Sequence, residues 1–295
     1  MDKTKAELKE LMDSYDLTNS YVAKATGLSP ATISQWKNDV YNADDKNIIE
    51  KIKNFIKREK ARYNNWNLPI KNISILQYIT EVARLCHTRG RIGVCVGAAG
   101  LGKTVAAKLY VEKYMDAILI ESNYSYTARS ILLELHEKLG LSCKGSAYSL
   151  MKEVIDKLKG SGRLIIVDEA ENLRREALEI TRAIHDKTNV GLLLIGRDVL
   201  LQNLRGRQNQ YDQLYSRVMY RKNLEGLIKN DVTNIIAGAG LKPDLANVFF
   251  GVCRGNTRRL EHLISNSLSV AQINGSKEVD DAIVHETSKM LMDKE

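Results

Sequence analysis

The sequence predicts an α/β domain, built on a parallel β-sheet with helices on both faces, between two helical parts. Apolar strand-like runs alternate with amphipathic helical stretches through the middle of the 295-residue chain, and this alternation is typical of parallel sheets. From about residue 228 onward the strand signals stop and helical patterns follow one another. Residues 1–62 have the pattern of a small all-α module.

The N-terminal module contains a pattern typical of a helix-turn-helix at residues 17–37. Gly27 supplies the turn, because glycine adopts left-handed backbone angles without a steric penalty. Ser29 is suited to cap a second helix, whose buried side would hold Ile33 and Trp36. The residues of this helix that could meet base edges or phosphates of DNA are Pro30, Ala31, Thr32, Ser34 and Gln35. A small helical bundle without a role in DNA binding is the alternative interpretation.

Helix-breaking residues follow this module. Asn64, Asn65, Asn67 and Pro69 predict a linker over residues 63–75. We therefore expect a helix-turn-helix domain at 1–62, a nucleotide-binding core at 76–226 and a helical domain at 227–295. The strands predicted for the core are 92–96, 117–121, 164–167, 192–195 and 218–220, and its helical stretches include 105–112, 128–139 and 173–185. The C-terminal part is predicted to form helices at 228–239, 243–252, 257–273 and 279–292.

A glycine-rich loop follows the first predicted strand. Residues 97–104, with the sequence GAAGLGKT, fit the pattern G-x-x-x-x-G-K-[ST] between a strand and a helix. In such a loop the backbone amides and the helix N-terminus surround the phosphates of a nucleoside triphosphate. Lys103 would reach the β- and γ-phosphates, and the Thr104 hydroxyl would hold Mg²⁺. The residues expected to bind ATP are Gly97, Ala98, Ala99, Gly100, Leu101, Gly102, Lys103, Thr104, Val105 and Asp168.

A second motif supports the same chemistry. The apolar run at 164–167 ends in two carboxylates, Asp168 and Glu169. At this place Asp168 would hold Mg²⁺ together with Thr104, and Glu169 would polarise the attacking water. A strand that happens to end in two solvated acids is the alternative, and the combination with the glycine-rich loop argues against it.

Composition limits the remaining classes of function. The formal net charge is +8, and basic residues concentrate at 51–62 and 197–229, which suits a polyanionic partner or a solvated helix face. No apolar run approaches the ~18 residues needed to span a membrane, and the N-terminus lacks the apolar stretch of a signal peptide. The four cysteines are scattered, so we expect reduced thiols and a cytoplasmic protein.

These motifs together resemble the AAA+ ATPases, in which a sheet domain with a phosphate loop is followed by a helical lid. That resemblance implies further site residues. Arg258, in the run GNTRR at 255–259, matches the arginine that the lid contributes to the site. Arg217, just before the last strand, matches the arginine that reaches the γ-phosphate of a neighbouring subunit. The polar Asn or Thr that the family has after its fourth strand is missing, since Gly196, Arg197 and Asp198 stand there.

Within the AAA+ proteins, the layout is similar to the B transposition proteins of Mu-like phages and their relatives in Tn7-like elements. The resemblance implies an ATPase that coats duplex DNA as a helical homo-oligomer, selects a target, recruits a DDE-type transposase and disassembles on hydrolysis. The partners implied are double-stranded DNA, the transposase and further copies of the chain, with no membrane involved. The place of action would be the cytoplasm of a bacterial host.

Two loops are candidates for contacts with DNA phosphates. One follows the second strand and contains Tyr124 and Arg129, and the other contains Arg205 and Arg207 on either side of a glycine. Both could instead be ordinary solvated loops. Two other functions remain open at this point. An ATP-regulated transcription regulator would bind a specific operator through residues 17–37, and a helicase loader would prefer single strands and a helicase partner.

Overall fold

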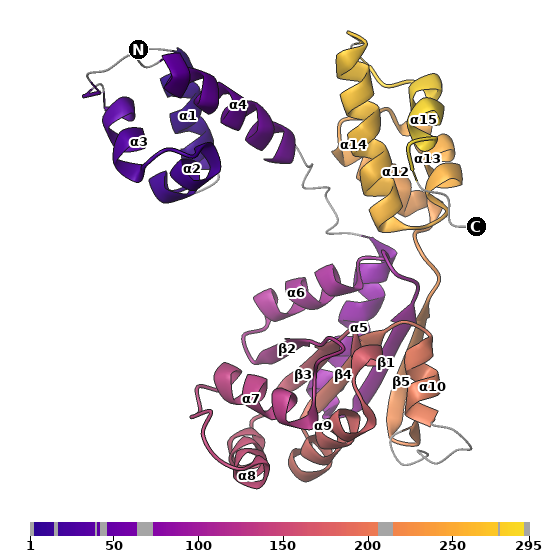
Figure 1. The fold of residues 1–295 in the computed structure, drawn as a ribbon. Helices are drawn as coiled ribbons and strands as arrows, with labels where there is room; N and C mark the ends of the chain where they lie inside the picture. The colour runs from indigo at the N-terminus through magenta and orange to yellow at the C-terminus, as the bar shows by residue number, and fades with distance from the viewer. Residues whose placement is uncertain are drawn as a thin grey trace. The chain divides into compact units, whose positions relative to one another are not determined.

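The computed structural model describes residues 3–14, 17–38, 40–41, 46–63, 73–205, 215–276 and 278–291. The chain divides into two compact units, Met1–Asn67 and Leu68–Glu295. Figure 1 shows the first unit as a group of helices and the second as a sheet domain with further helices.

The first unit is all-α and contains a helix-turn-helix. Its helices are α1 (Lys3–Ser14), α2 (Asn19–Thr26), α3 (Pro30–Lys37) and α4 (Lys46–Tyr63). Leu8, Val22, Ile33, Trp36 and Ile52 are buried together in its core, so each helix contributes to one hydrophobic cluster. Side chains from all four helices therefore hold this small domain together.

The turn between α2 and α3 has the geometry that the sequence predicts. Gly27 ends α2 with a left-handed backbone (φ 69°). The Ser29 hydroxyl then accepts a hydrogen bond from the Thr32 amide at 3.0 Å, which caps α3. Pro30 occupies the first position of α3, where its missing N–H group costs no helix hydrogen bond. The prediction of a helix-turn-helix is confirmed.

The second unit contains a five-stranded, entirely parallel sheet with the strand order β2-β3-β4-β1-β5. The strands are β1 (Ile92–Gly97), β2 (Ala117–Glu121), β3 (Leu164–Asp168), β4 (Gly191–Gly196) and β5 (Val218–Leu224). Because all strands run in one direction, their carboxyl ends lie along one edge of the sheet. The loops that carry the predicted nucleotide-binding residues begin at this edge.

Helices cover both faces of the sheet, as the predicted fold class requires. One buried cluster joins alternate strand residues such as Ile92 and Val94 to α7 (Ala128–Lys138), α8 (Ala147–Leu158) and α9 (Arg175–Thr188). A second cluster joins the opposite face to α5 (Ser74–Arg89) and α6 (Lys103–Lys113). The short helices η2 (Ala170–Asn172) and α10 (Val199–Arg205) follow β3 and β4.

The helices after β5 form the lid, which consists of α12 (Lys229–Gly238), η4 (Pro243–Leu245), α13 (Ala246–Cys253), α14 (Thr257–Ile273) and α15 (Asp281–Ser288). A buried carboxylate joins the start of the lid to the start of α5. Asp231 accepts hydrogen bonds from the Ser74 amide (2.9 Å) and hydroxyl (2.6 Å), and from the Ile228 amide (3.1 Å). One side chain thereby satisfies the amides at the ends of two helices.

The structure differs from the sequence-based elements in a few places. Helices α5, α8 and α10 were not specified by the sequence patterns. Strand β5 continues to Leu224 instead of ending at residue 220, because residues 220–224 pair with β1 along its whole length. Since β5 is an edge strand, its polar residues can face solvent, and an apolar pattern is not needed there. The predicted domain boundaries at 62, 75 and 226 stay predictions.

The four cysteines are free. Cys86, Cys95 and Cys253 are buried, and Cys143 is exposed in the loop between α7 and α8. Burial raises the pKa of both Cys86 and Cys95 to about 12.

Candidate functional site

The glycine-rich loop forms a tight turn between β1 and α6. Gly100 and Gly102 have left-handed backbones (φ 81° and 86°), which residues with side chains rarely adopt. A methyl group on Gly97 would come within 2.8 Å of Leu224, and one on Gly100 within 2.6 Å of the Asn256 amide oxygen. Glycine is therefore required here both by backbone conformation and by close packing.

Lys103 and Thr104 begin α6 and face the end of β3. The Lys103 ammonium donates hydrogen bonds to the carbonyl oxygens of Gly97 (2.8 Å) and Ala98 (2.7 Å). Burial lowers the pKa of Lys103, and the carboxylates of Glu171 and Asp168 act against this effect. A partly buried cation of this kind is well suited to an anionic ligand, whose charge would stabilise the ammonium form.

Asp168 lies at the end of β3 and is almost completely buried. Its Oδ2 accepts a hydrogen bond from the Thr104 hydroxyl at 2.5 Å, and its Oδ1 accepts one from the Glu169 amide at 2.9 Å. Burial raises the pKa of this carboxyl, and both hydrogen bonds act against the increase. The hydroxyl and carboxylate oxygens are hard ligands of the kind that Mg²⁺ prefers, and Mg²⁺ usually needs only a few protein ligands beside phosphates.

Glu169 follows in an unusual conformation. Its backbone is left-handed (φ 52°), and its Oε2 accepts a hydrogen bond from the Asn172 side-chain amide at 2.9 Å. The Ser122 hydroxyl supports the turn by donating to the carbonyl oxygens of Asp168 (2.8 Å) and Glu169 (2.9 Å). Strained backbone held by several hydrogen bonds is common where a side chain must be aimed for function.

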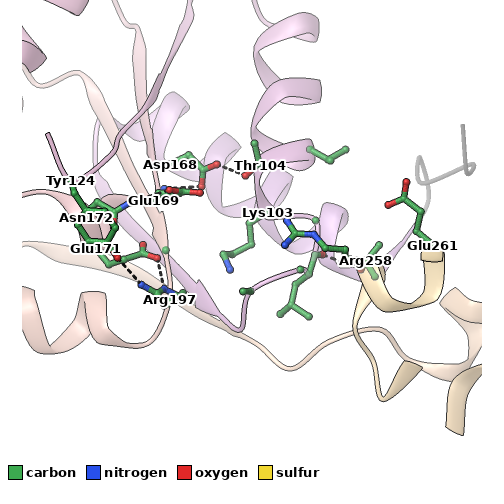
Figure 2. A pocket seen from close by; sticks show the side chains of 17 residues that line it. Lys103, Thr104, Tyr124, Asp168, Glu169, Glu171, Asn172, Arg197, Arg258 and Glu261 are labelled. Carbon is green, nitrogen blue, oxygen red and sulfur yellow. Dashed lines mark hydrogen bonds and ion pairs between the residues drawn. The ribbon is translucent and has the colours of Figure 1, made fainter. Parts of the chain in front are cut away.

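The lid reaches this site through the first residues of α14. The Asn256 side-chain amide donates to the Ala99 carbonyl (2.9 Å), the Thr257 hydroxyl donates to the Leu101 carbonyl (3.2 Å), and the Arg258 amide donates to the Gly100 carbonyl (3.0 Å). Three consecutive lid residues thus bind three consecutive carbonyls of the loop. As Figure 2 shows, the Arg258 side chain is among those that line the pocket together with Lys103.

These elements enclose one pocket. It is lined by Ala99, Gly100, Leu101, Gly102, Lys103, Thr104, Val105, Tyr124, Asp168, Glu169, Glu171, Asn172, Gly196, Arg197, Thr257, Arg258 and Glu261. The pocket combines backbone turns that only glycine permits, a partly buried ammonium and a hydroxyl–carboxylate pair. These residues fit a nucleoside triphosphate with Mg²⁺, which Thr104 and Asp168 would hold. The structure brings together the predicted residues Lys103, Thr104, Asp168, Glu169 and Arg258.

Six further residues line this pocket that were not among the predicted site residues: Glu171, Asn172, Gly196, Arg197, Thr257 and Glu261. Asn172 holds Glu169, and Glu171 pairs with Arg197, whose Nε lies 2.8 Å from Glu171 Oε1. The sequence feature that could have indicated these roles is the run DEAEN at 168–172, in which a third carboxylate and an amide follow Asp168 and Glu169. It could not be interpreted without knowing that η2 turns the chain back toward the pocket.

Arg217 lies outside the pocket of its own chain. Its side chain is 49% exposed, and its NH1 forms an ion pair with Asp186 Oδ1 at 2.7 Å. The other carboxylate oxygen of Asp186 is bound by Arg182 at 2.6 Å. An exposed ion pair of this kind contributes little free energy, roughly 0–1 kcal/mol, so Arg217 can leave it at small cost.

The residues predicted to contact DNA differ in how far they are exposed to solvent. On α3, Pro30, Ala31 and Gln35 are exposed, whereas Thr32 and Ser34 are half-buried. Tyr124 is 73% exposed, and its ring lies at the edge of the pocket (Figure 2).

Two of the three predicted arginine contacts, Arg129 and Arg205, have partners within the chain. Arg129 donates to the Gly145 carbonyl at 3.0 Å, and thereby supports the loop between α7 and α8. Arg205 donates to the Tyr215 hydroxyl at 2.8 Å and stacks on its ring. Arg207 lies outside the described residues.

Comparison with known proteins agrees with this architecture. Residues 86–204 match the family described as AAA domain, and residues 8–50 match the helix-turn-helix family. The chain is similar in structure to the ORC2 protein of Aeropyrum pernix in complexes with ADPNP and ADP (17% identity, TM-score 0.59, 75% of this chain and 68% of that one). It is also similar to the RuvB Holliday junction branch migration motor of Thermotoga maritima (17% identity, TM-score 0.50, 73% and 67%). The fold is therefore an AAA+ phosphate-loop fold, and the predicted fold class is confirmed.

Similarity in sequence extends over most of the chain. It is 28% identical over 237 residues to the ATP-dependent target DNA activator B of Escherichia phage Mu, which covers 78% of this chain and 76% of that protein. It is 24% identical over 245 residues to the Mu-like prophage FluMu DNA transposition protein B of Haemophilus influenzae, which covers 81% and 85%. The resemblance to this group, based on the sequence motifs, is confirmed. Among the described residues, no helix is long and apolar enough to cross a membrane.

Proposed function

We propose that this chain is an ATPase that binds duplex DNA in response to ATP and prepares it as a target for a DDE-type transposase. The chain carries an AAA domain and a helix-turn-helix, and it is similar to the Mu-like B transposition proteins. The observation that carries the proposal is the pocket at the carboxyl edge of the sheet. Lys103, the Thr104–Asp168 pair and Glu169 lie there together, and the lid binds the phosphate loop directly.

In the nucleotide-binding step, Lys103 exchanges its two carbonyl partners for the β- and γ-phosphates of ATP. The loop amides and the N-terminus of α6 surround the same phosphates. Arg258 adds a cation from the lid side. Mg²⁺, when bound through Thr104 and Asp168, neutralises phosphate charge.

In the hydrolysis step, Glu169 takes a proton from the attacking water. The hydrogen bond from Asn172 fixes the carboxylate that does this. Proton transfer to a positioned carboxylate contributes about 10²–10⁴ to a rate. The rest of the acceleration comes from the cations around the phosphates.

Assembly of several copies of the chain supplies a further cation, Arg217, to each nucleotide pocket. Because Arg217 is exposed and absent from the pocket of its own chain, it serves the pocket of a neighbouring copy. An arginine supplied in this way can accelerate hydrolysis by about 10³–10⁵. Nucleotide at such an interface favours assembly through its higher affinity for the assembled state. Hydrolysis removes the γ-phosphate contact and thereby favours disassembly.

DNA binding follows from the same assembly. The contacts are mainly to phosphates, and they come from α3 and from the side chains of Tyr124, Arg129, Arg205 and Arg207. We place this activity in the cytoplasm of a bacterial host. Phosphate contacts carry little sequence information and weaken with salt. The proposed binding is therefore largely independent of DNA sequence.

Electron microscopy of the full chain with random-sequence duplex tests this function. Filaments on DNA are expected with ATP or a non-hydrolysable analogue, and they should disappear with ADP. A Glu169→Gln variant should keep its filaments after ATP is added, because it binds ATP without hydrolysing it. Tight binding to one operator regardless of nucleotide would refute the proposal and support a transcription regulator. A preference for single strands would support a helicase loader.

A further inference from the structure

The end of β4 carries an arginine–glutamate pair inside the nucleotide pocket. Arg197 Nε donates a hydrogen bond to Glu171 Oε1 at 2.8 Å. Glu171 is the buried partner, with 6% of its side chain exposed, whereas Arg197 is 50% exposed. The pair therefore has a buried acidic end and a solvent-exposed basic end.

Several contacts hold Glu171 in this place. Its carbonyl oxygen accepts a hydrogen bond from the Asn203 side-chain amide at 3.1 Å. A methyl group on Gly196 would lie 2.3 Å from Glu171 Oε2, so the glycine before Arg197 makes room for the carboxylate. Glu171 Oε2 is buried and has no hydrogen-bond partner among the described residues. A buried carboxylate oxygen without a partner is unusual in a folded protein, and such atoms are found where a function requires them.

Electrostatics places this pair beside the phosphate-binding residues. Among the carboxylates that raise the pKa of Lys103, Glu171 has the largest effect, and Arg197 lowers the same pKa. Both side chains line the pocket together with Lys103. An anion bound by Lys103 would consequently attract the guanidinium of Arg197.

Arg197 also contacts a side chain at the surface. Its NH2 donates to the Tyr124 hydroxyl at 3.5 Å, a long hydrogen bond. Tyr124 belongs to the loop after β2 and is 73% exposed. As Figure 2 shows, Tyr124, Glu171 and Arg197 lie close together at one end of the pocket. Since Nε binds Glu171, the terminal nitrogens can change partners while the side chain stays anchored.

We propose that Arg197, anchored on Glu171, couples the nucleotide to the Tyr124 loop by exchanging the Tyr124 hydroxyl for the terminal phosphate of ATP. With ADP, Arg197 keeps Tyr124 at the edge of the pocket. With ATP, the stronger charged acceptor takes the guanidinium, and Tyr124 is released to contact DNA. The inference rests on the proposed function, and it adds the route by which nucleotide state reaches the DNA-binding surface.

The test measures two quantities for the full chain, loaded with a non-hydrolysable ATP analogue or with ADP. One is the ratio of affinities for the two nucleotides without DNA. The other is the ratio of affinities for a fluorescent random duplex in the two nucleotide states. We expect the second ratio to be about 10-fold or more for the natural chain, within the range of measured couplings. A ratio of 1 for the natural chain would refute the proposed function itself.

Variants then isolate the coupling. Arg197→Ala should reduce nucleotide discrimination by about 10-fold, as expected for one lost charge-assisted hydrogen bond, and Glu171→Gln should lower it in the same direction. Tyr124→Phe should instead raise nucleotide discrimination, because the hydroxyl no longer competes with the phosphate for Arg197, and it should reduce the DNA ratio. Arg89→Ala is the matched control, because Arg89 also contacts a tyrosine hydroxyl, that of Tyr220 at 3.4 Å, at the opposite end of the strands.

The double variant decides whether the two residues act together. If Arg197 works through Tyr124, the DNA ratio of the Arg197→Ala, Tyr124→Phe double variant should equal that of Arg197→Ala alone. If the two effects multiply, or if Arg197→Ala keeps both natural ratios, the coupling is refuted while the proposed function stands.

Discussion

At the scale of single residues, the nucleotide pocket depends on a few side chains that occur as neighbouring pairs in the sequence. Lys103 and Thr104 begin one helix, Asp168 ends one strand and Glu169 follows it directly, so local geometry fixes the separation within each pair. Their chemistry could be predicted because the motifs are contiguous in sequence. Glu171, Asn172 and Arg197 could not be predicted, since their roles depend on a turn of η2 and on a contact between β3 and β4 loops.

Replacing Lys103 by Ala should abolish tight binding of ATP. The ammonium would make charge-assisted hydrogen bonds to two phosphates, and losing them should weaken binding by about 100-fold or more. Titration with a fluorescent ATP analogue measures this. Lys108→Ala on the same helix is the control, because Lys108 is exposed and pairs with Glu121. Equal affinities in both variants would contradict the assignment of the phosphate loop.

Replacing Glu169 by Gln should slow hydrolysis without weakening ATP binding. The amide has nearly the same shape but accepts no proton from water, so turnover should fall by about 10²–10⁴. Single-turnover release of phosphate measures this, and Glu176→Gln, an exposed change in α9, serves as the comparison. Normal turnover in Glu169→Gln would remove this residue from its catalytic role.

At the scale of elements, the helices and strands with strong periodicity were predictable. Strand β2 and helix α14 have the bounds that the sequence predicts, Ala117–Glu121 and Thr257–Ile273. Helix α8 was not predicted, although its apolar face is buried against α7 and α9, because Gly145 and the polar residues before it interrupt the apolar pattern of this segment. The contact between the lid and the phosphate loop was also not predictable, since it joins residues 156 and 157 positions apart through backbone carbonyls that no motif marks.

The cap of α3 can be tested as a single element. Ser29→Ala removes the acceptor for the Thr32 amide and should destabilise the helix by about 1 kcal/mol. Amide hydrogen exchange within α3, measured by mass spectrometry on the full chain, should become about 5-fold faster. Ser20→Ala, an exposed change in α2, should have little effect. Unchanged exchange in Ser29→Ala would show that this cap does not hold the helix.

At the scale of the whole molecule, the proposed function needs more than one copy of the chain. The pocket contains three cations from its own chain, Lys103, Arg197 and Arg258, while Arg217 remains paired with Asp186 outside it. A head-to-tail arrangement, in which each copy completes the site of the next, produces a ring or a helix.

Mixing two inactive variants tests this arrangement. Lys103→Ala disables the pocket but keeps Arg217, and Arg217→Ala keeps the pocket but lacks the arginine, so each alone should hydrolyse ATP slowly. An equimolar mixture with DNA should regain up to about a quarter of the natural rate, because random order places an intact pocket beside an intact arginine at about that frequency. A mixture no faster than its components would mean that Arg217 does not act between copies.

The location of Cys143 gives experimenters a reporter without any mutation. Maleimide dyes react with accessible sulfur, and the buried positions 86, 95 and 253 are shielded from them. A fluorophore attached at Cys143 would lie two residues from Gly145, whose carbonyl accepts the Arg129 hydrogen bond. Its emission should change as the neighbouring surface meets a duplex, so that arrival and departure could be followed in real time on the otherwise natural polypeptide.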